Sequence, residues 1–324
     1  MIKVGVLMGG PSAESGISMK TGESVLANLP KNYFGKDIVI SKQGDWLFNG
    51  AFSHPEKILR SVDVVFNALH GVFGEDGKVQ QILEVFGVPY TGSAVLASAV
   101  GMNKILAREF FGKAGLLTPL AAANKENEPS VEFAKRVLRT MGPAWVVKPA
   151  SSGSSVGVSI ARDFDALVSA VEAALAYGPR VIVEEFIEGR EATCGVVDDF
   201  RKQEYYALPV IEIIPPEKSD FFDYDAKYGG ETREVCPANF DQPVKTAMED
   251  MARKAHKALG CRHYSRADFI VSKRRANGET KIYILEVNTL PGLTTESLLP
   301  KAINAIGSSY SEFLDHLLTL ALKK

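Results

Sequence analysis

Cysteine is scarce in this sequence, and the three that occur are far apart. Cys194, Cys236 and Cys261 form no C-x-x-C pair, which excludes a disulfide framework and a zinc knuckle and favours a reducing compartment. No run of about 18 apolar residues occurs without a charge, so no membrane-spanning helix is expected. The apolar stretch Val4–Met8 is too short for the core of a signal peptide. By elimination we expect a cytoplasmic protein.

The sequence also lacks a net charge of either sign. Lys+Arg number 37 and Asp+Glu number 39, which leaves a formal net charge of -2. No global positive field is therefore available to hold nucleic acid or an anionic membrane surface. What is present is enough material for a sizeable core, because 324 residues with 46% hydrophobic and 23% charged residues are typical of a globular protein. This length predicts two domains, or three small ones.

Residues 1–93 alternate short apolar runs with amphipathic stretches, which predicts a β-α-β layout with buried parallel strands. Strands are predicted at Lys3–Met8, Asp37–Ile40, Val62–Ala68 and Val88–Tyr90, and helices at Ser18–Leu29 and Val79–Phe86. Ligands of such a sheet bind beyond the carboxyl ends of its strands, where polar glycine-containing segments stand at residues 9–14 and 70–77. The first segment lacks the G-x-G-x-x-G spacing of a dinucleotide site, so we expect no nicotinamide or flavin.

Two further units are predicted after residue 93. In residues 94–186, helices are predicted at Lys104–Ala114, Val131–Met141 and Phe164–Ala176, and strands at Ala144–Pro149, Val156–Ala161 and Val181–Phe186. In residues 187–324, strands are predicted near Thr193–Val197, Tyr205–Ile214, Ala267–Val271 and Ile282–Val287, and helices at Val244–Leu259 and after Ser309. The segment Pro215–Ala238 is long, polar and without periodicity, and such loops inside compact domains are usually functional or disordered.

The most informative segment is V-V-K-P-A-S-S-G-S-S-V-G at residues 146–157. A strand delivers Lys148, Pro149 ends the strand ladder, and the small residues that follow let backbone N–H groups converge on anionic oxygens. This arrangement suits a phosphate group, although it is not a Walker loop because no G-K-[ST] follows. Lys104, on a separate predicted helix, could add a second positive charge. The alternative is a flexible Ser/Gly hairpin turn with a solvated lysine.

Acidic residues gather at the ends of several predicted strands. The strand at residues 181–186 runs into a cluster of carboxylates, which is either a nucleotide-binding hinge or a set of exposed strand-end charges. Further along, period-two alternation puts Glu286 and Asn288 on one face of a strand, and Asp268 could join them from the neighbouring strand. Oxygen ligands of this kind suit Mg²⁺, and a buried carboxylate cluster without a cation would be costly. The alternative is solvent-facing acids on an amphipathic hairpin.

With these residues in view, the chain closely resembles the D-alanine:D-alanine ligase family of the ATP-grasp superfamily along essentially its whole length. The matching motifs are HGxxGEDG at His70–Gly77, KPASSGSSVG at Lys148–Gly157, RxD at Arg266–Asp268 and EVNTLPGLT at Glu286–Thr294. The resemblance implies an α/β fold, α+β in its ATP-binding part. A Rossmann-like N-terminal substrate domain, residues 1–93, would precede a two-domain ATP-grasp fold with a central domain at 94–186 and a C-terminal domain at 187–324.

The resemblance also implies roles for individual residues around ATP. The residues that match ATP-binding positions are Lys104, Lys148, Ser151, Ser152, Gly153, Ser155, Glu184, Glu185, Ile187, Glu191 and Lys227. Among them, the lysines at 104 and 148 would bind phosphate, and Glu184, Glu185, Ile187 and Glu191 would contact adenine and ribose. Asp268, Glu286 and Asn288 would be ligands of Mg²⁺ or Mn²⁺, with two ions expected.

The remaining matches concern the amino-acid substrates. Glu14 would hold the ammonium group of the first D-alanine, and His70 and Glu75 lie in the matching substrate loop. Arg266 and the backbone N–H of Gly292 would stabilise an oxyanion. Ser297 and Leu298 would bind the carboxylate of the second D-alanine. Tyr228 lies in a segment that resembles the family's mobile omega loop, where it would form a latch with Glu14 and Ser154.

The activity implied is ATP-dependent ligation of two D-alanines through a D-alanyl phosphate, for peptidoglycan precursor synthesis, by a homodimer. Two alternatives stay open. One is a D-alanine:D-lactate or D-serine ligase on the same scaffold, and the other is a catalytically silent nucleotide-binding protein. The chain departs from the usual family pattern at Ser15-Gly16, after Glu14, and at Glu296, where a histidine is frequent. The second departure predicts extra negative charge in the pocket for the second substrate.

Overall fold

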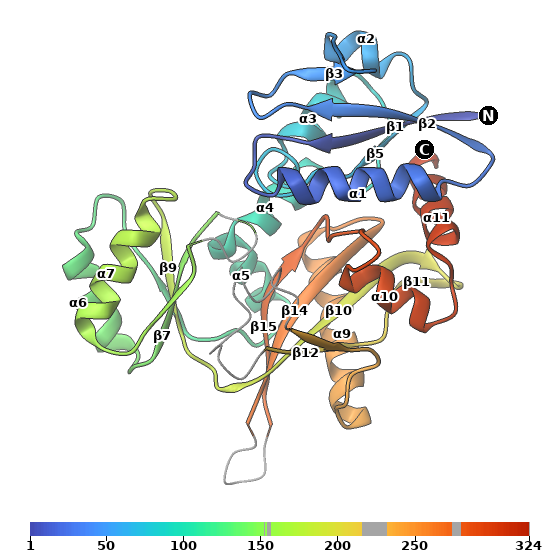
Figure 1. Ribbon diagram of the computed structural model, residues 1–324. Coiled ribbons are helices and arrows are strands. Elements are labelled where there is room, and N and C mark those ends of the chain that lie inside the picture. Colours follow the sequence, from blue (N-terminus) through green and yellow to red (C-terminus); the bar gives the residue numbers. More distant parts are fainter. Residues whose placement is uncertain (152, 154–156, 216–231, 274–279, 324) are drawn as a thin grey trace.

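Three β-sheets follow one another along the chain in the computed structural model (Figure 1). The structure describes residues 1–151, 153, 157–215, 232–273 and 280–323. The three cysteines are free, in agreement with the expectation of no disulfide framework. None of the helices within the described ranges combines the length and the apolar character that a membrane crossing requires.

The first sheet has the strand order β4-β3-β2-β1-β5. Its parallel strands are β1 (Ile2–Gly9), β2 (Tyr33–Ile40) and β5 (Val64–Asn67), and β3 (Trp46–Phe48) and β4 (Ala51–Phe52) extend it as an antiparallel hairpin. The helices of this region are α1 (Ser15–Asn28), α2 (Pro55–Leu59) and α3 (Lys78–Val85). The strand predicted at Val88–Tyr90 is wrong, because this segment makes only a single bridge, between Val65 and Tyr90.

The second sheet is antiparallel, in the order β6-β9-β7-β8. It consists of β6 (Ala121–Ala123), β7 (Trp145–Pro149), β8 (Ser159–Ala161) and β9 (Val181–Glu185). Helices α6 (Ser130–Thr140) and α7 (Phe164–Leu175) cover it around the buried side chains of Phe133, Trp145 and Val183. In Figure 1 this sheet and its helices form a green lobe beside the rest of the molecule.

The third sheet has the order β13-β12-β10-β14-β15, with β11 paired to β10. Its strands are β10 (Gly189–Phe200), β11 (Gln203–Ala207), β12 (Ile211–Ile214), β13 (Arg233–Val235), β14 (Tyr264–Ser272) and β15 (Ile282–Asn288). The single strand predicted at Tyr205–Ile214 is wrong. The chain leaves the ladder around Pro209, which lacks an N–H donor, and this separates β11 from β12.

Helices α4 (Val95–Met102) and α5 (Lys104–Lys113) pack against the third sheet. They meet at Asn103, whose side-chain oxygen accepts hydrogen bonds from the N–H groups of Ile105 and Leu106 and so starts α5. Phe111 of α5 is buried with Phe269 and Ile284 of the sheet. The predicted central domain, 94–186, contains both helices, and the predicted domain boundaries stay predictions.

The C-terminal part of the chain returns to the first sheet. After α9 (Gln242–Leu259) and α10 (Leu298–Ala305), helix α11 (Tyr310–Leu322) lies beside α1 and β5 (Figure 1). Phe313 and Leu317 of α11 belong to the same buried cluster as Val6 and Phe66 of the first sheet. This packing fixes α1 over the end of the third sheet, which is where the candidate site lies.

Substitution Phe313→Ala should destabilise the protein by about 3–5 kcal/mol, because it removes a fully buried aromatic ring between two elements. The measurement is the midpoint of urea unfolding. Phe52→Ala is the matched control, since Phe52 is 63% exposed. Equal midpoints for the two variants would contradict the docking role of α11.

Candidate active site

Two cavities meet at the side chain of Arg266. The larger, of about 920 Å³, lies between α1, the loop of residues 70–75 and residues 288–301. The smaller, of about 110 Å³, lies between the second and third sheets. Arg266 lines both of them, from strand β14. A ligand in one cavity is therefore in reach of a ligand in the other at this guanidinium group.

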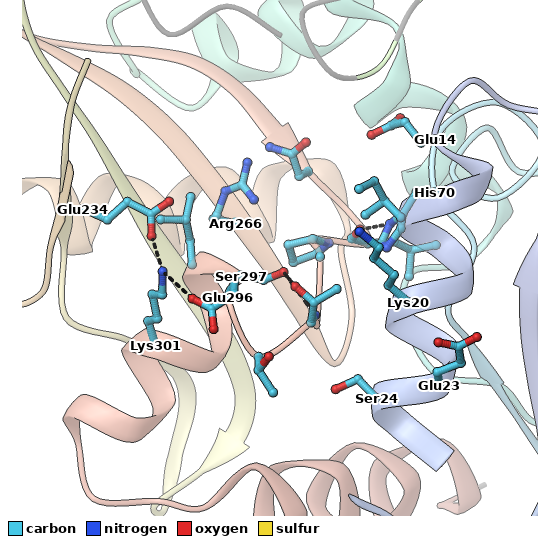
Figure 2. A pocket seen from close by; sticks show the side chains of 18 of the residues that line it. Glu14, Lys20, Glu23, Ser24, His70, Glu234, Arg266, Glu296, Ser297 and Lys301 are labelled. Carbon is cyan, nitrogen blue, oxygen red and sulfur yellow. Dashed lines mark hydrogen bonds and ion pairs between the residues drawn. The ribbon is translucent and has the colours of Figure 1, made fainter. Parts of the chain in front are cut away.

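The larger cavity brings together every residue that the sequence predicts for the amino-acid substrates, within the described part of the chain. Figure 2 shows Glu14 and His70 on the side of α1, with Arg266 and Ser297 on the side of the third sheet. The predicted residues on the cavity wall are Glu14, His70, Glu75, Arg266, Gly292, Ser297 and Leu298, together with Asn288.

Glu14 is placed by close backbone packing. It is the residue that precedes α1, and its backbone N–H donates to the hydroxyl of Ser12 over 3.1 Å. A Cβ atom on Gly71 would lie 2.7 Å from Glu14 Oε2, and one on Gly153 would lie 2.9 Å from it. A larger residue at either position would therefore press on the Glu14 carboxylate, and Gly153, in the turn after β7, approaches it closely.

His70 is buried, and both of its ring nitrogens are bonded to protein. Nδ1 lies 3.1 Å from the carbonyl oxygen of Leu290, and Nε2 lies 2.9 Å from Thr21 Oγ1. Burial lowers the pKa of His70 to about 4, so the ring is neutral at pH 7. Because a carbonyl oxygen only accepts, Nδ1 carries the proton and Nε2 accepts from the threonine hydroxyl. His70 therefore joins the first sheet to the loop after β15 and supports the cavity wall.

Glu75 faces the same cavity with an altered acidity. Burial, with the nearby charge of Glu14, raises its pKa to about 8. The Gly71 N–H donates to Glu75 Oε2 over 3.1 Å, which holds the side chain in place. At neutral pH the Glu75 carboxyl is protonated in the protein without substrate, so the two neighbouring acids do not both carry a full charge.

Gly292, Ser297 and the start of α10 form a compact corner of the larger cavity. Ser297 precedes the first residue of α10, and its hydroxyl accepts from the N–H of Thr294 over 3.1 Å. A Cβ on Gly292 would lie 2.9 Å from Ser297 Oγ, so a larger residue there would push the hydroxyl aside. The N-terminal N–H groups of a helix favour a carboxylate.

The extra negative charge that Glu296 predicts is partly offset by Lys301, one turn into α10. Lys301 Nζ lies 2.8 Å from Glu234 Oε2 and 3.7 Å from Glu296 Oε2. Figure 2 shows the three side chains together at one end of the cavity. The sequence prediction named only Glu296, because Glu234 lies on β13 and meets the lysine only in the folded chain.

The smaller cavity is lined by apolar and charged side chains together. Val146, Ile160 and Phe269 line it together with predicted nucleotide-binding residues. Those predicted residues are Lys104, Lys148, Glu184, Glu185, Ile187 and Glu191. Two of them form a close pair, since Lys148 Nζ lies 2.6 Å from Glu184 Oε2. Burial alone would lower the pKa of Lys148, but the charge of Glu184 outweighs it, and the pKa lies above its usual value.

The predicted metal ligands stand side by side on β14 and β15, where Asp268 pairs with Glu286. Asp268 accepts from Arg266 Nε and Nη2, each over 2.9 Å, and from Asn288 Nδ2 over 3.0 Å, while Glu286 Oε2 lies 3.1 Å from Lys104 Nζ. Burial would lower the pKa of Arg266, but the charge of Asp268 raises it above its usual value.

This donor set fits a divalent cation as a partial ligand shell. Two carboxylates and an amide are oxygen donors of the kind that Mg²⁺ prefers, with water and phosphate oxygens as further ligands. Asn288 would have to present its Oδ1, whereas its Nδ2 faces Asp268 here. Within the described ranges no three His, Cys, Asp or Glu side chains form a group that could hold a metal ion.

A few predicted residues are not on the walls of either cavity. Ser151 is an exposed turn residue after β7, and Gly153 approaches Glu14 as described above. Ser152, Ser154, Ser155, Lys227 and Tyr228 lie outside the described residues, so the predicted latch is not described. Sequence reasoning missed Arg108 and Lys301. Arg108 stands four residues after Lys104 on α5, and Lys301 stands four residues after Ser297, which precedes α10; this spacing was the available signal.

Comparison with known proteins gives one consistent family. Residues 113–319 match the family model described as "D-ala D-ala ligase C-terminus", and residues 51–93 match "D-ala D-ala ligase N-terminus". The chain is 42% identical over 99% of its length to "D-alanine--D-alanine ligase" of Syntrophobacter fumaroxidans, of which it covers 98%. It is 41% identical to the protein of the same name from Geobacter sulfurreducens, with 98% of this chain and 94% of that one covered.

Solved structures are also similar to this chain over nearly its whole length. The D-alanine--D-alanine ligase of Bacillus anthracis complexed with ATP has a TM-score of 0.80 and 32% identity, with 100% of this chain and 98% of that one covered. The VanG D-Ala:D-Ser ligase of Enterococcus faecalis has a TM-score of 0.84 and 30% identity, with 99% of both chains covered. The predicted fold class is confirmed by these neighbours. The chain belongs to the D-alanine:D-alanine ligase family.

Proposed function

We propose that this protein joins two D-alanines into D-alanyl-D-alanine with conversion of ATP to ADP and phosphate, as a step of peptidoglycan precursor synthesis in the cytoplasm. The observation that carries the proposal is the meeting of the two cavities at Arg266. One cavity has the charged corners that amino acids need, and the other has the apolar walls and lysines that a nucleotide needs. A reaction that moves a phosphoryl group onto an amino acid requires this contact.

The nucleotide would lie in the smaller cavity with its phosphates toward Lys104 and Lys148. These ammonium groups offset the negative charge of the phosphates during transfer. Asp268, Glu286 and Asn288 would hold Mg²⁺, which when bound neutralises phosphate charge. Before any ligand binds, Lys104 pairs with Glu286 and Lys148 with Glu184, so the cations are already positioned by carboxylates.

The first D-alanine would bind with its ammonium group at Glu14 and its carboxylate toward Arg266 and the nucleotide. A carboxylate oxygen then attacks the γ-phosphorus, the bond to the β-γ bridging oxygen breaks, and ADP leaves. The product is an acyl phosphate, whose phosphate is a good leaving group. The preformed positions of Glu14 and Arg266 on opposite walls hold the reacting oxygen in line, which is the main contribution that a protein makes to such a transfer.

The second D-alanine would bind with its carboxylate at Ser297 and the start of α10. Its amine attacks the acyl carbon, and negative charge develops on the carbonyl oxygen. Arg266 and the backbone N–H of Gly292 are placed to stabilise that oxyanion. Phosphate leaves with the oxygen that it took from the first carboxylate, and the amine loses a proton. We propose that a homodimer carries out this reaction, as the family resemblance implies.

A hydroxy acid is not favoured as the second substrate. The relatives that are 42% and 41% identical to this chain are both named D-alanine--D-alanine ligase, which favours an amino acid as the second substrate. The experiment is ADP release and product analysis with D-alanine alone, with D-alanine plus D-lactate, with D-alanine plus D-serine and with L-alanine. We expect dipeptide from D-alanine alone, and no D-alanine-dependent ADP between pH 7 and 9 would overturn the proposal.

Arg266→Ala should lower kcat by about 10² or more, because one oxyanion donor is lost. Nucleotide binding, measured as the Kd for ADP by calorimetry, should change little. Arg253→Ala is the matched control, since Arg253 pairs with Asp250 on α9 and lines neither of the two cavities. An unchanged kcat in the Arg266 variant would show that another group meets the oxyanion.

Glu75→Gln should be stabilised relative to the parent protein as the pH rises. The folded protein holds the Glu75 proton up to a pKa of about 8, against 4.5 for an ordinary glutamate. The parent therefore loses folding stability between pH 4.5 and 8, and the glutamine variant does not.

The difference in the free energy of unfolding between the two proteins should grow by at least about 1 kcal/mol between pH 5 and pH 8. Urea unfolding at both pH values measures it. Glu126→Gln, at an exposed position, controls for the loss of one charge. A difference that is the same at both pH values would contradict the placement of Glu75.

A further inference from the structure

We propose that Arg108 is a positioning residue that selects the base of the nucleotide, by holding the Glu184 carboxylate as a hydrogen-bond acceptor for a 6-amino purine. Neither the motifs nor the expected roles include Arg108. The inference rests on the proposed binding of a nucleotide in the smaller cavity and adds a source of base specificity to it.

Glu184 is the most deeply buried carboxylate on the walls of the smaller cavity. Its side chain is 3% exposed, against 16% for Asp268 and 26% for Glu286. A separate cation holds each oxygen, since Arg108 Nη1 lies 2.9 Å from Oε1 and Lys148 Nζ lies 2.6 Å from Oε2. A carboxylate so deeply buried is stable only with such partners.

Arg108 is itself fixed by the fold. It lies one turn after Lys104 on α5, so both side chains project from the same face of the helix toward the cavity. Arg108 Nη2 also donates to the carbonyl oxygen of Pro119, a residue that lines the cavity. The guanidinium group thus connects three parts of the chain, which are α5, β9 and the segment that precedes β6. It also sets the direction of the Glu184 carboxylate.

The two cations on Glu184 are not equivalent once a nucleotide binds. Lys148 would turn its charge toward the phosphates, which weakens its hold on Oε2. Arg108 keeps its hold on Oε1, because its second terminal nitrogen, Nη2, is bound to the carbonyl oxygen of Pro119 and both partners belong to the fold. Arg108 would then be the group that balances the negative charge of Glu184 and fixes its orientation when the nucleotide is bound.

The charge of Glu184 suits contact with the base of the nucleotide rather than with its phosphates. A buried carboxylate repels phosphate oxygens, whereas an exocyclic amino group on a purine offers an N–H donor. A carboxylate has about four acceptor positions, and two are occupied by Arg108 and Lys148. A 6-amino purine therefore gains a hydrogen bond to a charged acceptor, and a 6-oxo purine places an oxygen against the carboxylate.

The test compares ATP with ITP, which has a 6-oxo group, as substrates of the full-length protein. In Arg108→Met, we expect the ratio of kcat/KM for ATP to that for ITP to fall by about tenfold or more, through the KM for ATP. The Kd values for ADP and IDP, measured by calorimetry, should change in the same way. Arg108→Gln is the second neutral variant, in case Arg108→Met does not fold.

Arg136→Met is the matched control, because Arg136 forms a comparable fork with Glu128 (2.7 and 2.9 Å) away from both cavities. It should leave the ATP:ITP ratio unchanged. An equal loss for both nucleotides in the folded Arg108 variants, or no loss for either, would overturn the inference. The ADP and IDP measurements give this answer even if the ligation reaction itself proves to be wrong.

Discussion

The pairing of Arg266 with Asp268 is the interaction that stands where the two cavities meet. The fork spans two hydrogen bonds of 2.9 Å within β14 and places a positive charge where the amino-acid cavity meets the nucleotide cavity. The carboxylates and cations around it neutralise one another, since Glu286 pairs with Lys104 across the gap between β15 and α5. The site is thus a set of ion pairs between side chains, and charged groups of the substrates can take the place of one partner in each pair.

The first sheet reaches this site because the C-terminal helix fastens it there. The buried side of α11 packs on β5 and α1, and Tyr33 OH donates to Asp315 Oδ1 over 2.8 Å at the edge of that contact. His70 adds a second connection through Leu290. Both connections hold α1, and with it Glu14, at a fixed position opposite Arg266. Although the chain has a formal net charge of only -2, its charged side chains have fixed positions around the site.

The long periodic elements could be predicted from sequence because the pattern itself reports burial, as in β1, α5 and α9. The short hairpin of β3 and β4 could not be predicted, because strands of two or three residues are too short to show a periodic pattern. The separation of β11 from β12 could not be predicted either, because it depends on a single proline, Pro209. The residues of the site likewise fall into those that a motif indicates and those that only the folded chain brings together. Motifs indicated Lys148 and Glu286, whereas Arg108 acts through a partner 76 residues away that only the folded chain brings into contact.

The central claim is that an oxygen of the first amino acid ends in the released phosphate. Incubation with ATP and D-alanine labelled with ¹⁸O in its carboxylate, followed by mass spectrometry of the phosphate, tests it directly. The account predicts one ¹⁸O atom in each phosphate and one carboxylate oxygen lost from the dipeptide at the new peptide bond. Unlabelled phosphate would show that water, not D-alanine, receives the phosphoryl group, and would contradict the acyl phosphate route.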